Sequence, residues 1–196
     1  MTPANLLAMT HADRVARLRG GGTCTAAELA VMVGPDTARF MLLRARPGSK
    51  PVLDLAALRT ATDANPAFRV RHAHARLRAL ARHATAVGIE PGDGAGPNGG
   101  IEPDRVELTH PRELELLDLL TDYGLVVGRD EPHRLVRRVE SVAEACARVE
   151  VCCRVLPLGD EPITDQHRAR VALCDAARRV LADGLRLLGI DAPERM

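Results

Sequence analysis

Residues 180–196 read VLADGLRLLGIDAPERM, and this stretch decides the fold. Leu181, Leu185 and Leu188 recur at three- and four-residue steps, which predicts a helix with one buried face. Gly189 follows the last of them, in the place where a helix commonly ends on a glycine. We therefore expect a helix that ends near Gly189, followed by a short tail that contains Pro193 and reaches Met196.

Two long helices precede that tail. Thr164 is a good N-cap residue, so the last helix is expected from about Thr164 to Leu188. Before it, Pro132 opens a helix from about His133 to Leu156, which Pro157 and Gly159 end. Its apolar residues return on one face over three heptads, and these are Leu135, Val139, Val142, Cys146, Val149, Cys153 and Leu156.

Further upstream the same helical period continues. A helical pattern covers residues 58–87, with a point of interruption at Asn65-Pro66. A shorter helix begins after His110-Pro111 and ends near Gly124 or Gly128. The stretch from Pro91 to Pro103 holds five Gly and three Pro, so we expect a flexible linker there.

The N-terminal part predicts short elements. Residues 1–22 indicate a loosely ordered arm that ends in three glycines. Thr25 and Glu28 form the pattern of a capping box, which predicts a helix over 26–33. A second helix is expected from Asp36 to Arg46. With no internal repeat and no convincing strand ladder, the sequence predicts an all-α antiparallel bundle, divided into residues 1–57 and a helical bundle of residues 58–196.

Composition limits the functional classes. Apolar residues make up 46% of the chain but aromatic residues only 2%, which suits a core of Leu, Val and Ala in packed helices. The net charge is +1, so any surface for nucleic acid must be local. The odd number of Cys argues against a disulfide framework. No signal peptide and no apolar run of membrane-spanning length is visible, which makes the cytoplasm the expected compartment.

One basic helix face stands out. Residues 65–88 contain five Arg, three His and no acid, and Arg71, Arg78 and Arg82 lie roughly opposite the apolar face. Such a face could follow phosphates. It could equally be a solvated surface, or a patch facing the acidic segment of residues 101–131, and the sequence leaves these alternatives open.

Metal chemistry is not indicated. His72 and His74 are two residues apart, so on a helix they point to different sides. Cys146, Cys152 and Cys153 lack the Cys-x-x-Cys spacing of zinc sites, and two of them lie on the apolar stripe, so we expect small core residues. The sequence predicts no metal, no cofactor and no catalytic residue.

Several blocks, in order, resemble one family. Residues 65–76 read NPAFRVRHAHAR and are similar to the NPVYYVQYAHAR signature of arginyl-tRNA synthetases. Residues 25–40, 132–135 and 153–157 are similar to further segments of that family. The ending, residues 188–196, is similar to the family's C-terminus, in particular to actinobacterial members.

This resemblance implies a fold and a ligand. It implies the helical anticodon-binding bundle of class I aminoacyl-tRNA synthetases, often called the DALR domain, as a free-standing module that binds tRNA, arginine tRNA first of all, for a partner enzyme or for regulation. It implies no DNA and no membrane. The residues expected to contact RNA are Arg71, Arg76, Arg78, Arg82, Arg154 and Met196.

The departures from the family shape the second hypothesis. The HIGH motif does not occur, and residues 17–22 (RLRGGG) stand where the KMSK loop would fall, so we expect no aminoacylation by this chain alone. Val149 and Glu150 replace a Phe–Tyr pair, which removes stacking rings and adds a charge that repels phosphate. The alternative is therefore a protein-interaction or scaffolding subunit that has lost RNA binding. Its apolar N-terminal helices would then contact a partner protein or a second copy.

Overall fold

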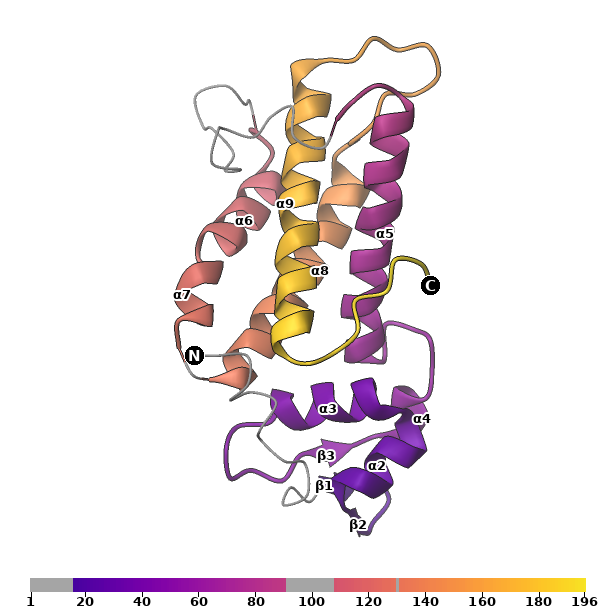
Figure 1. Cartoon of the computed structure of the whole chain (residues 1–196), viewed down its shortest axis with the longest axis vertical. Coiled ribbons are helices and arrows are strands. Elements are labelled where there is room, and N and C mark those ends of the chain that lie inside the picture. The colour runs from indigo at the N-terminus through magenta and orange to yellow at the C-terminus, as the bar shows by residue number, and fades with distance from the viewer. Residues whose placement is uncertain (1–15, 91–107, 130) are drawn as a thin grey trace.

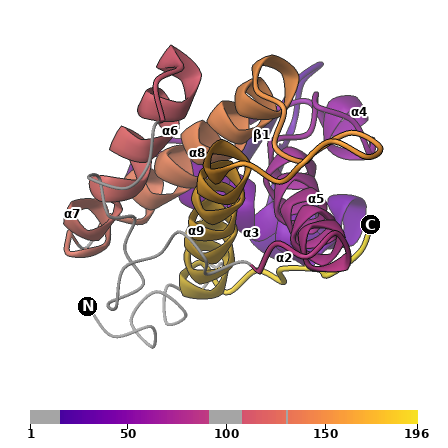
Figure 2. The same ribbon diagram turned by 90° about the horizontal axis from the view of Figure 1, so that it is seen from above.

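The computed structural model describes residues 16–90, 108–129 and 131–196. Three long helices form the bundle, and they are α5 (Pro66–Ala86), α8 (Pro132–Cys152) and α9 (Asp165–Leu187) (Figure 1). Seen from above, α6 (Pro111–Thr121) and α7 (Tyr123–Val127) lie on the side of α8 and α9 that is remote from α5 (Figure 2). The prediction of an all-α fold is confirmed.

A smaller layer lies at the lower end of the bundle in Figure 1. It contains the helices α2 (Ala26–Val33), α3 (Pro35–Arg44) and α4 (Leu55–Leu58). Beside them β1 (Ala16–Leu18) pairs antiparallel with β2 (Thr23–Cys24) and parallel with β3 (Val52–Leu53). The expectation of no strand ladder was therefore wrong. Strands of two or three residues are too short to show an alternating pattern. In addition, β1 and β3 are far apart in the sequence, with α2 and α3 between them.

Part of the expected N-terminal arm forms regular structure. Within the expected loose arm, residues 16–22 instead form β1 and the turn toward β2, in which Gly20, Gly21 and Gly22 all have positive φ. Residues 1–15 and 91–107, which include the whole expected linker from Pro91 to Pro103, lie outside the described residues.

Helix ends follow their capping residues. The Thr25–Glu28 capping box is present, and α2 spans the predicted residues. The pattern over 58–87 is broken because Asn65 caps α5, its side chain accepting hydrogen bonds from the backbone of Ala67 and Phe68. The second helix, α3, starts at Pro35 and ends at Arg44, before the predicted Arg46.

The end of α8 differs most from the prediction. The helix stops at Cys152 because Cys153 is extended, so Leu156 lies beyond the helix. Two contacts fix the segment after it. The guanidinium of Arg170 donates to the backbone carbonyl of Arg154 at 2.9 Å and to the fully buried carboxylate of Glu113 at 2.6 Å. This segment is therefore tied to α6 and α9 at once.

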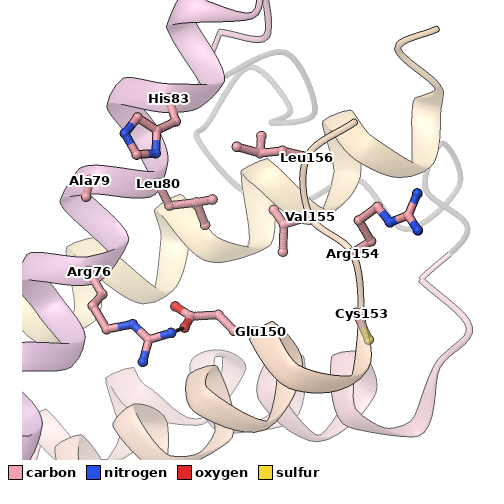
Figure 3. Close-up of a pocket in the computed structure, with 9 residues that line it drawn as sticks. All are labelled: Arg76, Ala79, Leu80, His83, Glu150, Cys153, Arg154, Val155 and Leu156. Carbon is pink, nitrogen blue, oxygen red and sulfur yellow. Dashed lines mark hydrogen bonds and ion pairs between the residues drawn. The ribbon is translucent and has the colours of Figure 1, made fainter. Parts of the chain in front are cut away.

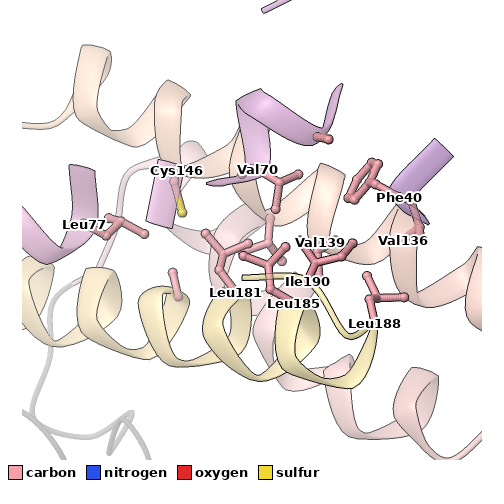
Figure 4. Packing of buried hydrophobic residues seen from close by; sticks show 14 of the residues in the cluster. Phe40, Val70, Leu77, Val136, Val139, Cys146, Leu181, Leu185, Leu188 and Ile190 are labelled. Carbon is pink, nitrogen blue, oxygen red and sulfur yellow. The ribbon is translucent and has the colours of Figure 1, made fainter. Parts of the chain in front are cut away.

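The core runs between α5, α8 and α9 and continues into α3 (Figure 4). Leu181, Leu185 and Leu188 are buried as their spacing predicted. Gly184 lets α9 approach α8 closely, since a Cβ at this position would overlap the Cγ1 of Val139. Ile190, beyond the helix end, is buried in the same cluster, so the tail starts from a fixed point.

Candidate nucleic-acid interface

The basic face predicted for α5 exists as a stripe along that helix. Arg71, His74, Arg78 and Arg82 follow one another at steps of three and four residues, so they share one side of α5. Arg82, near the end of α5, is exposed and forms no ion pair with any residue that the structure describes. The other members of the stripe have partners.

The C-terminal tail lies along this stripe. The last helix ends at Leu187, with Leu188 as its C-cap residue. Gly189 has φ 67°, a left-handed conformation that suits glycine and turns the chain away from the axis of α9. Arg39 of α3 donates to the Gly189 carbonyl. The tail then crosses from the end of α9 to α5 (Figure 1).

Two acidic residues of the tail pair with the stripe. The Nε of Arg71 donates to the backbone carbonyl of Asp191 at 3.2 Å, and its Nη2 lies 3.6 Å from the carboxylate of Asp191. Arg71 also lies 3.6 Å from the Asp36 carboxylate. Arg78 forms an ion pair with Glu194. Arginines predicted to contact phosphate thus already have carboxylate partners, and these come from the tail and α3.

His74 also connects α5 to the C-terminal tail. Its ring is buried, and Nδ1 lies 3.0 Å from the backbone carbonyl of Pro193, to which it donates. Burial lowers the pKa of the His74 imidazole, and the guanidinium groups of Arg178 and Arg78 act in the same direction. His74 therefore serves as a neutral donor that holds the tail.

Beside the stripe, a surface cleft of about 430 Å³ opens between α5 and the segment after α8 (Figure 3). Leu80, Val155 and Leu156 give it an apolar lining. On its wall Arg76 forms an ion pair with Glu150. Burial raises the pKa of the Glu150 carboxyl, which Arg76 only partly opposes. Glu150, expected on an RNA-facing surface, is thus mostly buried and paired.

The remaining predicted contacts lie at the edges of this region. Arg154 lines the same cleft and donates to Glu161 at 2.8 Å and 3.0 Å. The side chain of Met196 is exposed. Sequence reasoning missed Asp191 and Glu194 as partners of the stripe. The sequence shows two acidic residues in this short tail, but no local pattern places the tail against α5.

The aromatic and sulfur groups have structural surroundings. Phe68 and His72 stack with their ring centroids 5.2 Å apart, so a ring that could stack on a base already has a partner. Cys146 and Cys153 are buried, as predicted, and Cys152 is exposed. Within residues 16–90, 108–129 and 131–196, no cluster of His, Cys, Asp or Glu could hold a metal ion. In the same residues, no helix is long and apolar enough to cross a membrane.

A bundle of α5, α8 and α9 with this tail defines an anticodon-binding fold of the class I synthetase type. Residues 70–196 match the model of the DALR anticodon binding domain. The chain therefore belongs to the DALR anticodon-binding domain family.

Comparisons with individual proteins agree. The chain is 41% identical over 182 residues to an arginine–tRNA ligase of Clavibacter sepedonicus, a match that covers 91% of the chain and 31% of the relative. It is also similar to two solved arginyl-tRNA synthetases. The structure from Thermus thermophilus has a TM-score of 0.61 at 25% identity, covering 86% of this chain and 27% of that one. The structure from Plasmodium falciparum has a TM-score of 0.64 at 16% identity, covering 86% and 28%. The chain thus spans less than a third of the length of the Clavibacter sepedonicus relative.

Proposed function

We propose that this chain binds tRNA through its DALR bundle and that arginine tRNA is its ligand. The family match over residues 70–196 carries the proposal, because it includes α5 with its arginine stripe, the cleft beside α8 and the whole tail. The contacts would be made by the residues predicted from the sequence, namely Arg71, Arg76, Arg78, Arg82, Arg154 and Met196.

The proposed role is to hold tRNA for a partner enzyme, or to regulate its use, in the cytoplasm. These 196 residues lack the HIGH tetrapeptide. The segment at the place of the KMSK loop forms β1 and a glycine turn, where Arg19 pairs with Asp54. Activation of arginine requires ATP phosphates and a carboxylate to be held together. We therefore assign binding, and no aminoacylation, to this chain by itself.

A filter-binding titration with purified arginine tRNA at rising salt tests the proposal. We expect an affinity that falls steeply with salt, because cationic contacts release counterions from the phosphates. Arg82→Ala should weaken binding and flatten the slope of log K against log salt by about 0.7–0.9, as one phosphate contact is lost. Arg46→Ala, an exposed arginine after α3, is the matched control. Absence of binding at low salt would contradict the proposal.

The identity of the bound tRNA is tested by a second titration. An equal titration with a tRNA for another amino acid separates arginine tRNA from tRNA in general. Tighter binding of arginine tRNA supports the proposed ligand. Equal affinities would limit the proposal to unspecific tRNA binding.

A second candidate is a protein-interaction subunit. It is favoured by the ion pairs of Arg71, Arg76, Arg78 and Arg154, which leave little free positive charge. Residues 1–57 would form its partner-binding unit, beside the helical bundle of residues 58–196. In this N-terminal unit Val31 and Val52 have 89% and 67% of their surface exposed. A dimer in light scattering that Val31→Ser with Val52→Ser abolishes would support this candidate, and a monomer would contradict its homodimer form.

A further inference from the structure

The tail follows the arginine stripe of α5 in a matched register. Asp191 contacts Arg71, Pro193 contacts His74, and Glu194 pairs with Arg78. Seven residues of an α-helix rise about 10.5 Å. Three steps of an extended chain span about 10 Å. The tail therefore runs alongside α5 in the same direction, and its two acids reach two successive arginines of the stripe.

The apolar and hydrogen-bonded contacts hold this tail in place independently of its charges. Ile190 is buried in the core, and the His74–Pro193 hydrogen bond involves neither acid. By contrast, the side chains of Asp191 and Glu194 are both 72% exposed. Exposed ion pairs contribute little to stability and are screened by salt. These two ion pairs thus add little to holding the tail, whereas their negative charges lie against Arg71 and Arg78.

We propose that the C-terminal tail is an intramolecular competitor for phosphate, in which Asp191 and Glu194 occupy the guanidinium groups that a polynucleotide backbone would bind. The proposal rests on the proposed tRNA binding. The incoming phosphates exchange with the two carboxylates at Arg71 and Arg78, and Arg82, which has no such partner among the described residues, is the first cation available to them. The tail lowers the affinity for RNA and so favours ligands that offer several phosphates at once.

The test compares the full chain with its Asp191→Asn and Glu194→Gln double variant, titrated with tRNA at several salt concentrations. We expect tighter binding by the variant at low salt. The slope of log K against log salt should be steeper for the variant, because in the unchanged chain salt also screens the carboxylates that compete for Arg71 and Arg78.

A charge-matched control separates competition from net charge. The Asp118→Asn and Asp122→Asn double variant removes two exposed acids from the end of α6, remote from α5 (Figure 2). It should leave the affinity near that of the unchanged chain. In addition, the gain from Glu194→Gln should disappear in an Arg78→Gln background, since the arginine that it releases is then absent.

The outcomes distinguish the two proposals. Binding by the unchanged chain with equal gains from the tail variant and the α6 variant would overturn the competitor role and leave tRNA binding intact. Absence of tRNA binding by every variant at low salt would overturn the proposed function itself. A larger gain and a steeper slope for the tail variant alone support the competitor role.

Discussion

The Nδ1 of His74 lies 3.0 Å from the carbonyl oxygen of Pro193, so a buried imidazole in the long helix α5 fastens the last residues of the chain. The charged groups of Arg178, Arg78 and Glu194 act on this imidazole. This contact joins positions that are 119 residues apart and sets where the tail lies.

The first prediction concerns the pH dependence of stability. Because burial lowers the pKa of His74 below its ordinary value of 6.5, the unfolded chain binds a proton more readily than the folded one. Stability due to this group is fully present above pH 6.5 and is lost as the pH falls toward the native pKa. His74→Gln keeps a side-chain donor but does not titrate, so its urea midpoint should fall less between pH 7.5 and 5.5. His83→Gln, at an exposed histidine of the same helix, should behave like the unchanged chain.

The second prediction concerns the close approach of α8 and α9. A Cβ on Gly184 would overlap Val139, so Gly184→Ala should destabilise the fold by about 1–3 kcal/mol although alanine favours helix. Gly124→Ala in α7 meets no atom within 4 Å and should be neutral or stabilising by about 0.5–1 kcal/mol. Urea unfolding measures both. If Val139→Ala fails to recover part of the loss in Gly184→Ala, the overlap is not its cause.

The third prediction concerns the buried carboxylate of Glu113. Although burial by itself raises its pKa, hydrogen bonds from Arg170 and the backbone of His110 outweigh this and lower the pKa. Glu113→Gln would leave Arg170, 12% exposed, without its counter-charge. We expect a loss of about 3 kcal/mol in the free energy of unfolding. Glu115→Gln, at a more exposed ion pair of the same helix, should cost much less, and equal losses would contradict the argument.

The fourth prediction concerns Glu150, whose side chain is 17% exposed in its pair with Arg76. Burial raises its pKa, so ionising this carboxyl costs more free energy in the folded chain than in the unfolded chain. Glu150→Gln should therefore raise the urea midpoint at pH 7. The difference should shrink as the pH falls toward 4.5, because the native carboxyl then takes up its proton. Glu144→Gln, at a pair whose carboxylate is 43% exposed, is the control and should show no such gain.

Local patterns in the sequence were sufficient for most helices. Thr25, Thr164 and Gly189 mark helix ends through their own capping chemistry, which acts within a few residues. The early end of α8 was not predictable in this way. Cys153 continues the apolar stripe, yet it leaves the helix where Arg170 of α9 holds the next carbonyl, a contact from a distant part of the chain.

The candidate site was likewise predicted only in part. Spacing alone placed Arg71, Arg78 and Arg82 on one face of a helix, because helical periodicity is a local property. It could not show that Asp191 and Glu194 cover that face, nor that Glu150 would be buried against Arg76. Ion pairs between residues far apart in the chain depend on how the helices and the tail pack. The sequence by itself therefore determined the bundle and its basic stripe, and only the tertiary structure decided which of those charges remain free.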